Sequence, residues 1–167
     1  MQQVKKLEDV IASLPGVSVR PHRFGAREFR LGNAEVGHVH GGEIVDIPFP
    51  LPVRDALLEE RLAEEHHWVP NSGWVTFRVR NDNDFQHAIW LMRLSYFRYG
   101  LKTADDPRKL LAQASQELQL TSWFKSLLER LIPSNQNKDS VDEPCIADAQ
   151  AELRPDPTRS PLTPSNG

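Results

Sequence analysis

The chain has 167 residues, a formal net charge of −3 and a single cysteine, Cys145. One cysteine excludes an internal disulfide framework and a Cys₄ zinc site, and no apolar run approaches the ~18–20 residues of a membrane span. The near balance of charge gives no electrostatic case for nucleic-acid binding. We therefore expect a soluble, cytoplasmic protein with no nucleic-acid and no membrane partner.

The first half of the chain alternates between helical and strand-like patterns. Residues 3–14 place apolar side chains at helical spacing, and Pro15-Gly16 ends this pattern. Glycine-rich turns separate four short β-prone runs, which predict an antiparallel meander at residues 17–20, 27–31, 35–40 and 43–49. Pro52 can open a helix in its first turn, and the pattern of residues 53–64 predicts an amphipathic helix with an acidic outer side.

The second half begins with the clearest strand, residues 73–80, in which apolar residues alternate with polar and aromatic ones. Residues 85–99 predict the main core helix. Its apolar stripe consists of Phe85, Ile89, Met92, Tyr96 and Tyr99 and is widened by Trp90, Leu91 and Leu94, and we expect this stripe to pack across the sheet. Two further amphipathic patterns, Leu110–Leu118 and Trp123–Leu131, predict short helices.

These elements predict an α+β fold in which an antiparallel β-meander sheet packs against helices. We expect residues 1–102 to form the α+β domain and residues 103–132 an amphipathic helical extension. Residues 133–167 hold six of the 13 prolines and no aromatic residue, so we expect a disordered, proline-rich tail there. The 121–132 helix either covers the domain or binds a protein partner.

The most distinctive motif is the pair His38 and His40. In a strand these side chains point to the same face, ~6–7 Å apart, a spacing that suits two ligands of one metal ion or an acid/base pair. A three-residue loop at 41–43 pairs His38 with Asp46, whereas a two-residue loop pairs His40 with Glu43. We favour the longer loop because it gives one coherent apolar face on the other side of the hairpin.

Further candidates lie just beyond the predicted acidic helix. His66 and His67 are adjacent, and adjacent side chains of an extended chain point in different directions, so we expect at most one of them to join the strand histidines. Trp74 and Arg78 would hold an aromatic, partly anionic ligand. Together with Asp46 and His66 they are the predicted substrate-binding residues. If a metal is bound, we expect His38, His40 and Asp46 as its ligands; the cofactor is either none or a divalent metal.

Three local motifs carry a family resemblance: the acidic-x-x-His-x-His segment at 35–40, the histidine ahead of the Pro-Asn-Ser-Gly-Trp segment at 70–74, and the helix that contains Ser95-Tyr96. With them, residues 13–102 resemble the luciferase-like family, named after the luciferase of luminous fungi. The order of elements is also similar to that of the small MmcQ/YjbR-like domains. This second resemblance implies an α+β architecture only, because fold does not fix function.

The luciferase-like resemblance implies an oxidoreductase or monooxygenase. The fungal enzyme oxidises a hydroxylated pyrone with molecular oxygen, without a separate organic cofactor, and yields an endoperoxide that loses carbon dioxide. By this resemblance His38 and His40 match its paired histidines and His67 (or His66) a later one, which makes them the catalytic candidates. The short glycine-rich loop after His40, and the lack of the N-terminal membrane anchor typical of the luminous enzymes, argue against light emission.

Two functions therefore stay open. The first is an oxygen-dependent oxidoreductase that acts on a small phenolic or pyrone-like compound, with histidine as general base or as metal ligand. The second is a non-catalytic module that binds a small ligand or, through the 121–132 helix, a protein.

Overall fold

The computed structural model describes residues 2–41 and 43–134. Residues 1–134 form one compact unit. From residue 135 onward, the predicted proline-rich tail lies outside the described residues. Within the described ranges the chain forms five α-helices, one 3₁₀ turn and six strands. In chain order they are α1 (Gln2–Ala12), β1 (Val17–Pro21), η1 (Arg23–Gly25), β2 (Arg27–Leu31), β3 (Ala34–His40), β4 (Ile44–Pro48), α2 (Leu51–Glu59), β5 (Glu64–Glu65), β6 (Trp74–Arg78), α3 (Asp82–Gly100), α4 (Pro107–Glu117) and α5 (Ser122–Glu129).

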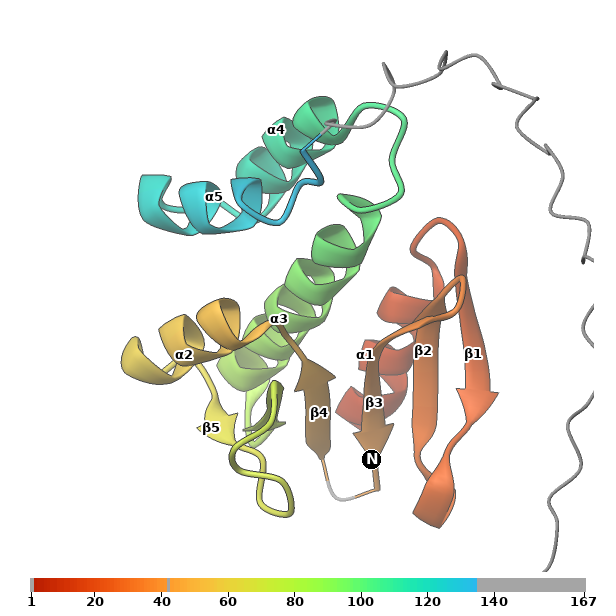
Figure 1. The fold of residues 1–167 in the computed structure, drawn as a ribbon. Helices are drawn as coiled ribbons and strands as arrows, with labels where there is room; N and C mark the ends of the chain where they lie inside the picture. The colour runs from red at the N-terminus through yellow and green to blue at the C-terminus, as the bar shows by residue number, and fades with distance from the viewer. Residues whose placement is uncertain (1, 42, 135–167) are drawn as a thin grey trace, which may run out of the picture. The chain divides into compact units, whose positions relative to one another are not determined.

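The strands form one antiparallel sheet in the order β1-β2-β3-β4-β6-β5. Figure 1 shows β1 to β4 side by side in this order. The first four strands are sequential neighbours, so the predicted meander and the α+β class are confirmed. The predicted helix at 53–64 ends early, at Glu59. Glu64 and Glu65 instead pair with β6, because the sheet offers them an open strand edge.

One face of the sheet carries the apolar core. Phe29, Val39, Val45, Ile47 and Val75 are all at most 1 % exposed, and α1 and α3 pack against the strands that bear them. The approach is close at Gly37, where an added Cβ would lie 2.7 Å from the sulfur of Met92 on α3. A larger residue there would force the Met92 side chain to move, and its Cβ would also lie only 3.0 Å from the backbone oxygen of Asp46.

The helix α3 buries three residues of the predicted stripe and four others. Of that stripe Leu91, Met92 and Leu94 are fully buried, and the other five members are half-buried and pack against the core. The helix contacts the sheet, α1 and α4, so burial extends around it, beyond the predicted stripe. The residues it buries are Ala88, Leu91, Met92, Leu94, Ser95, Phe97 and Arg98.

The helices α4 and α5 extend the same core. Phe124, Leu127 and Leu128 on α5 are at most 7 % exposed, and the Trp90 indole on α3 donates a hydrogen bond of 2.9 Å to the Leu118 carbonyl. The apolar side of the predicted 121–132 helix thus packs inward. Trp123, which is 48 % exposed, lies on its outer side.

The hairpin β3–β4 has the predicted three-residue loop. Its register pairs His38 with Asp46, Val39 with Val45 and His40 with Ile44. The alternative pairing of His40 with Glu43 is therefore wrong. Glu43 itself adopts φ 68°, which supplies the left-handed turn position that such a loop needs.

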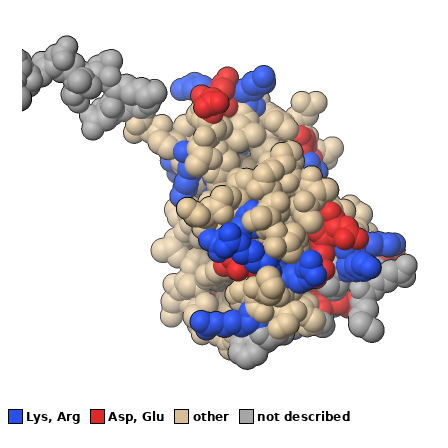
Figure 2. Space-filling model, turned by 90° about the vertical axis from the view of Figure 1, so that its right-hand side faces the viewer, with Lys and Arg blue, Asp and Glu red and all other residues tan. Residues whose placement is uncertain are grey.

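Among the described residues no helix has both the length and the apolar character needed to cross a bilayer. Basic and acidic side chains lie next to one another on the side of the molecule at the β1 edge of the sheet (Figure 2). The face drawn there is thus of mixed sign, as the near balance of charge predicts.

Candidate functional site

The face of the sheet opposite α1 and α3 carries a row of polar side chains. The strand register aligns one residue from each strand, so the row crosses all six strands. In sheet order its members are Arg20, Glu28, His38, Asp46, Thr76 and Glu64. The centre of this row is buried, although it is polar: His38 is 6 % exposed, Thr76 1 % and Asp46 0 %.

Three imidazoles converge on a single oxygen of Asp46. Its Oδ2 lies 3.1 Å from Nε2 of His40, 3.5 Å from Nε2 of His38 and 3.6 Å from Nε2 of His66. We call these four residues the histidine–aspartate cluster. None of the three contacts has hydrogen-bond geometry, so Oδ2 has no hydrogen-bond partner among the described residues. A buried carboxylate oxygen without a hydrogen-bond donor lowers the stability of the folded state unless another group compensates its charge.

The atoms on the outer side of the cluster do have partners. The Thr76 hydroxyl donates to Asp46 Oδ1 at 2.5 Å, which fixes the carboxylate with Oδ2 turned toward the imidazoles. His38 Nδ1 donates to the Glu35 carboxylate at 2.6 Å. When His38 is neutral its imidazole carries one proton, so this bond then leaves the lone pair on Nε2, facing Asp46.

A β-bulge brings Glu35 to this face. Residues three apart in a regular strand point to opposite faces, which would place Glu35 away from His38. The β2–β3 register, however, shifts between Phe29 and Arg30, so that Arg30 pairs with Glu35 while Phe29 pairs with Gly37. The extra residue on β3 resets the alternation and returns Glu35 to the side of His38.

The predicted pair His66 and His67 is split by burial. His66 is 5 % exposed and joins the cluster, whereas His67 is exposed. Their rings stack, with centroids 5.0 Å apart and an interplanar angle of 4°, rather than pointing in different directions as expected. The backbone N–H of Trp68 donates to Nδ1 of His66 at 3.2 Å. This bond places the His66 proton on Nε2, toward Asp46.

Aromatic and charged neighbours complete the site. The Trp74 ring lies 5.2 Å from the ring of His38 and 6.0 Å from that of His66, measured between centroids. Arg78 shares this face of β6, but its guanidinium is exposed and its Nε lies 3.6 Å from a carboxylate oxygen of Glu64. Trp74 is thus part of the site, and Arg78 lies at its edge.

The charges of the cluster influence one another. Burial lowers the pKa of His38, but the carboxylates of Asp46 and Glu35 outweigh it and raise this pKa to about 9. Burial raises the pKa of Asp46, whereas His38 and the Thr76 hydroxyl lower it, with a net shift downward. Burial lowers the pKa of His40 and of His66. The site therefore holds an ionised carboxylate that draws positive charge to it.

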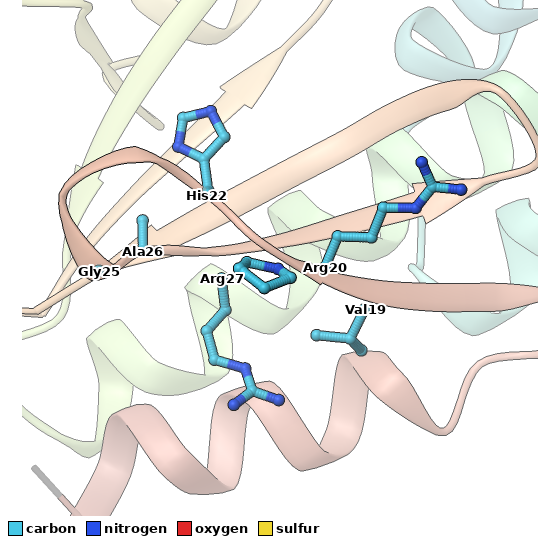
Figure 3. Close-up of a pocket in the computed structure, with 7 residues that line it drawn as sticks. Val19, Arg20, His22, Gly25, Ala26 and Arg27 are labelled. Carbon is cyan, nitrogen blue, oxygen red and sulfur yellow. The ribbon is translucent and has the colours of Figure 1, made fainter.

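His22 extends the cluster toward the β1 edge. Its ring stacks on that of His38, with centroids 4.2 Å apart and an interplanar angle of 14°. A cavity of about 260 Å³ opens beside it. Figure 3 shows that His22 points away from the side of the strand on which Val19 and Arg27 point toward α1. The ring thus belongs to the polar face, and those two residues to the helix face.

Among the residues that the structure describes, three overlapping sets of side chains each bring three donor atoms within 4.8 Å of one another: His38, His40 and Asp46; His22, Glu35 and His38; and Asp46, His66 and His67. The first set is the one that the sequence predicts. It combines two histidines with one carboxylate, which is the donor set of non-haem iron sites with open positions.

Sequence reasoning missed three members of the site: Glu35, Thr76 and His22. Glu35 stands in the acidic-x-x-His-x-His motif, so that motif was the available signal, but the bulge that directs it cannot be seen in the pattern. Thr76 follows from the hairpin register once β6 is paired with β4. His22 is a single histidine in a loop, and nothing in its surroundings marks it.

Comparison with known proteins matches one part of the chain to a family model. Residues 33–95 match the model of the Luciferase domain. No curated protein and no solved structure matches the chain, and the similarity to MmcQ/YjbR-like domains stays a prediction. The matched segment contains the whole histidine–aspartate cluster with Glu35 and Thr76. The expected resemblance is thus confirmed: residues 33–95 of the chain carry a luciferase-like domain.

Proposed function

We propose that this protein is an oxygen-dependent oxidoreductase that acts on a small phenolic or pyrone-like compound at the histidine–aspartate cluster. One observation carries the proposal: the imidazoles of His38, His40 and His66 converge on one buried oxygen of Asp46, within the segment that matches the Luciferase domain. A structural role alone would not favour a buried carboxylate oxygen that lacks a hydrogen-bond donor.

The surroundings of the cluster suit an aromatic hydroxy compound. The Trp74 ring, next to His38 and His66, offers an apolar face on which a planar ring can stack. His40, whose side chain is 14 % exposed, gives the cluster a side toward solvent. A phenolic or enolic hydroxyl placed there would lose its proton to solvent through the imidazoles of the cluster.

Ionisation is the step that makes such a compound reactive toward oxygen. The anion delocalises its charge onto ring carbon, and O₂ then adds with both of its atoms. Two C–O bonds form, and the second bond between the oxygen atoms is consumed. The electrons come from the substrate, so this addition needs no external reductant, and the hydroxyl proton returns to the product.

The test is oxygen consumption by the purified protein with a panel of hydroxylated phenols and hydroxypyrones. We expect uptake with at least one compound class and its loss in the His38→Ala/His40→Ala double variant. His87→Gln is the matched control, since His87 lies on α3 and binds the Leu62 carbonyl instead of the cluster. Equal uptake by the double variant and the wild type would contradict the proposal.

A second candidate is a non-catalytic module that binds a small ligand. The aromatic rings around His66 favour it, because Trp68 and Trp74 lie 6.2 Å and 6.0 Å from that ring between centroids and would bind a planar compound without chemistry. In this case the same panel would quench tryptophan fluorescence with no oxygen uptake, and the double variant would still bind.

A further inference from the structure

We propose that Nε2 of His38, Nε2 of His40 and Oδ2 of Asp46 are the ligand atoms of one divalent transition-metal ion. Its part in catalysis rests on the proposed function, but the evidence for the ion is the geometry of these side chains. Three observations bear on it: the spacing of the donor atoms, the partners of the atoms behind them, and the buried oxygen that lacks a donor.

The spacing of the donor atoms fits a shared ion better than direct hydrogen bonds. Ligand atoms ~2.1 Å from one metal ion are ~3.0 Å apart at right angles and ~3.4 Å apart at tetrahedral angles. Oδ2 of Asp46 lies 3.1 Å from Nε2 of His40 and 3.5 Å from Nε2 of His38. These separations are the edges of such a polyhedron, and neither contact has hydrogen-bond geometry.

The hydrogen-bond partners of the ligand side chains also fit a metal site. A metal-binding histidine usually donates its other N–H to a carboxylate or carbonyl, which fixes the ring and makes it a better ligand. His38 does so through Nδ1 to Glu35, at 2.6 Å. The Thr76 hydroxyl bonds the other oxygen of Asp46, so that Oδ2 alone faces inward. The carboxylates of Asp46 and Glu35 also supply the negative charge that a divalent cation needs.

The other two donor sets are less suited. In the set of His22, Glu35 and His38, the Glu35 carboxylate is bound to Nδ1 of His38. In the set of Asp46, His66 and His67, Nδ1 of His66 accepts the Trp68 N–H, so Nε2 carries a proton and has no lone pair to give. His66 is better placed to donate a hydrogen bond to whatever binds at the open positions.

Two imidazoles and one carboxylate leave coordination positions free. This donor set is typical of iron(II) sites that bind substrate or oxygen at those positions, and the same ligands also accept zinc, cobalt and manganese. We therefore infer a divalent first-row transition metal, with iron(II) as the ion that would serve oxygen chemistry.

The experiment is a titration of the full chain, after treatment with a chelator, with Co²⁺ as the probe, followed by visible absorption and by calorimetry. We expect one Co²⁺ per chain. His40→Ala should weaken binding by at least ~100-fold, because a ligand is lost, and Glu35→Gln by ~10–100-fold, because the ring of His38 loses its partner.

The matched control for Glu35→Gln is Glu28→Gln. Glu28 is the register neighbour of His38 on β2, but its carboxylate is bound by Arg30. It should leave the affinity for Co²⁺ unchanged, as should His87→Gln. Circular dichroism checks that each variant is folded, and His40→Gln replaces His40→Ala if the latter is not.

The proposal is overturned if the wild type binds no Co²⁺, or if the His40 and Glu35 variants bind it like the wild type. It is also overturned if Glu28→Gln weakens binding as much as Glu35→Gln, since a general loss of negative charge would then explain both. Oxygen uptake by chelator-treated protein would refute the metal's part in catalysis and leave the proposed function standing. Stoichiometric Co²⁺ binding without oxygen uptake by the iron-loaded protein would support the metal site and contradict the proposed function.

Discussion

The two faces of the sheet are built from the same strands and differ in almost every other respect. On the helix face, Val45 and Ile47 are fully buried against other apolar side chains. Between them Asp46 is equally buried, but on the opposite face and among imidazoles. Burial thus has two different effects in this fold. On the helix face, the burial of apolar side chains stabilises the domain. On the opposite face, burial brings charged side chains close together.

Successive side chains of a strand point to opposite faces of the sheet, so the apolar and the polar residues are strictly separated. A shift of one residue in register would exchange the two faces, so the apolar residues that hold β3 and β4 in register also aim His38, His40 and Asp46. The stability of the helix face is therefore what positions the cluster. Substitutions on the two faces should separate the two properties.

Of the substitutions that separate the two faces, Asp46→Asn should have the largest effect on Co²⁺ affinity and on oxygen uptake. The amide keeps the shape of the side chain but removes the charge that we propose binds the cation, so Co²⁺ affinity and oxygen uptake should each fall by at least ~100-fold. The domain should stay folded, with a modestly lower free energy of unfolding, because Asp46 and His38 stabilise each other's charged forms. Metal content and uptake rate, measured on the same preparation, check this.

If Asp46→Asn instead melted the domain while the remaining folded fraction bound Co²⁺ normally, the carboxylate would be a structural group. The comparison of the two faces would then fail.

Ile47→Ala is the counterpart on the helix face. It should lower the free energy of unfolding by about 2–5 kcal/mol, because it leaves a cavity in a fully buried site. At a temperature where the variant is still folded, it should bind one Co²⁺ per chain with an affinity close to that of the wild type. Urea unfolding and the Co²⁺ titration measure the two outcomes separately. A loss of affinity comparable to that of Asp46→Asn would show that the faces are not separable.

The charge of His38 predicts a pH dependence of stability in the presence of a chelator. Its pKa is raised from 6.5 to about 9 by Asp46 and Glu35, against the effect of burial. The stabilisation is therefore full below pH 6.5 and lost as the pH rises through 9. The difference of about 2.5 pKa units corresponds to about 3 kcal/mol.

Urea unfolding in a chelator-containing buffer at pH 6 and at pH 9.5 measures this loss, and His38→Gln should remove most of it. Equal pH dependence in the wild type and the variant would place the titrating group elsewhere.

The smallest effect should come from Thr76→Val, which keeps the volume and removes the hydroxyl. The loss of its bond to Asp46 Oδ1 should cost about 1–3 kcal/mol, because a buried acceptor is left unpaired. Co²⁺ affinity should fall by no more than ~10-fold, since Asp46 keeps its charge and place on β4. Thermal unfolding and the Co²⁺ titration check this. An unchanged melting temperature would mean that Thr76 does not hold the carboxylate.

Local patterns predicted those parts of the site that depend on regular geometry. The spacing of His38 and His40 placed both on one face, and the coherent apolar face on the other side selected the register that brings Asp46 opposite His38. Both follow from the twofold repeat of a strand.

The remaining parts depend on irregular or long-range features. Glu35 reaches His38 only through a bulge, which a pattern of alternation hides. The choice of His66 over His67 follows from the path of the chain between β5 and β6, and the buried set of α3 follows from packing against three partners at once. Such features are decided by tertiary contacts, which the local sequence does not contain.

The most direct test is a crystal structure of the protein loaded with Co²⁺ or iron(II), with anomalous diffraction recorded at the absorption edge of the metal. We expect a single anomalous peak on the polar face of the sheet, ~2.0–2.2 Å from Nε2 of His38, Nε2 of His40 and Oδ2 of Asp46. Glu35 should still accept the His38 Nδ1 proton. A peak held by His66 and His67 instead, or a cluster without a peak in which His40 hydrogen-bonds directly to Asp46, would contradict the metal centre.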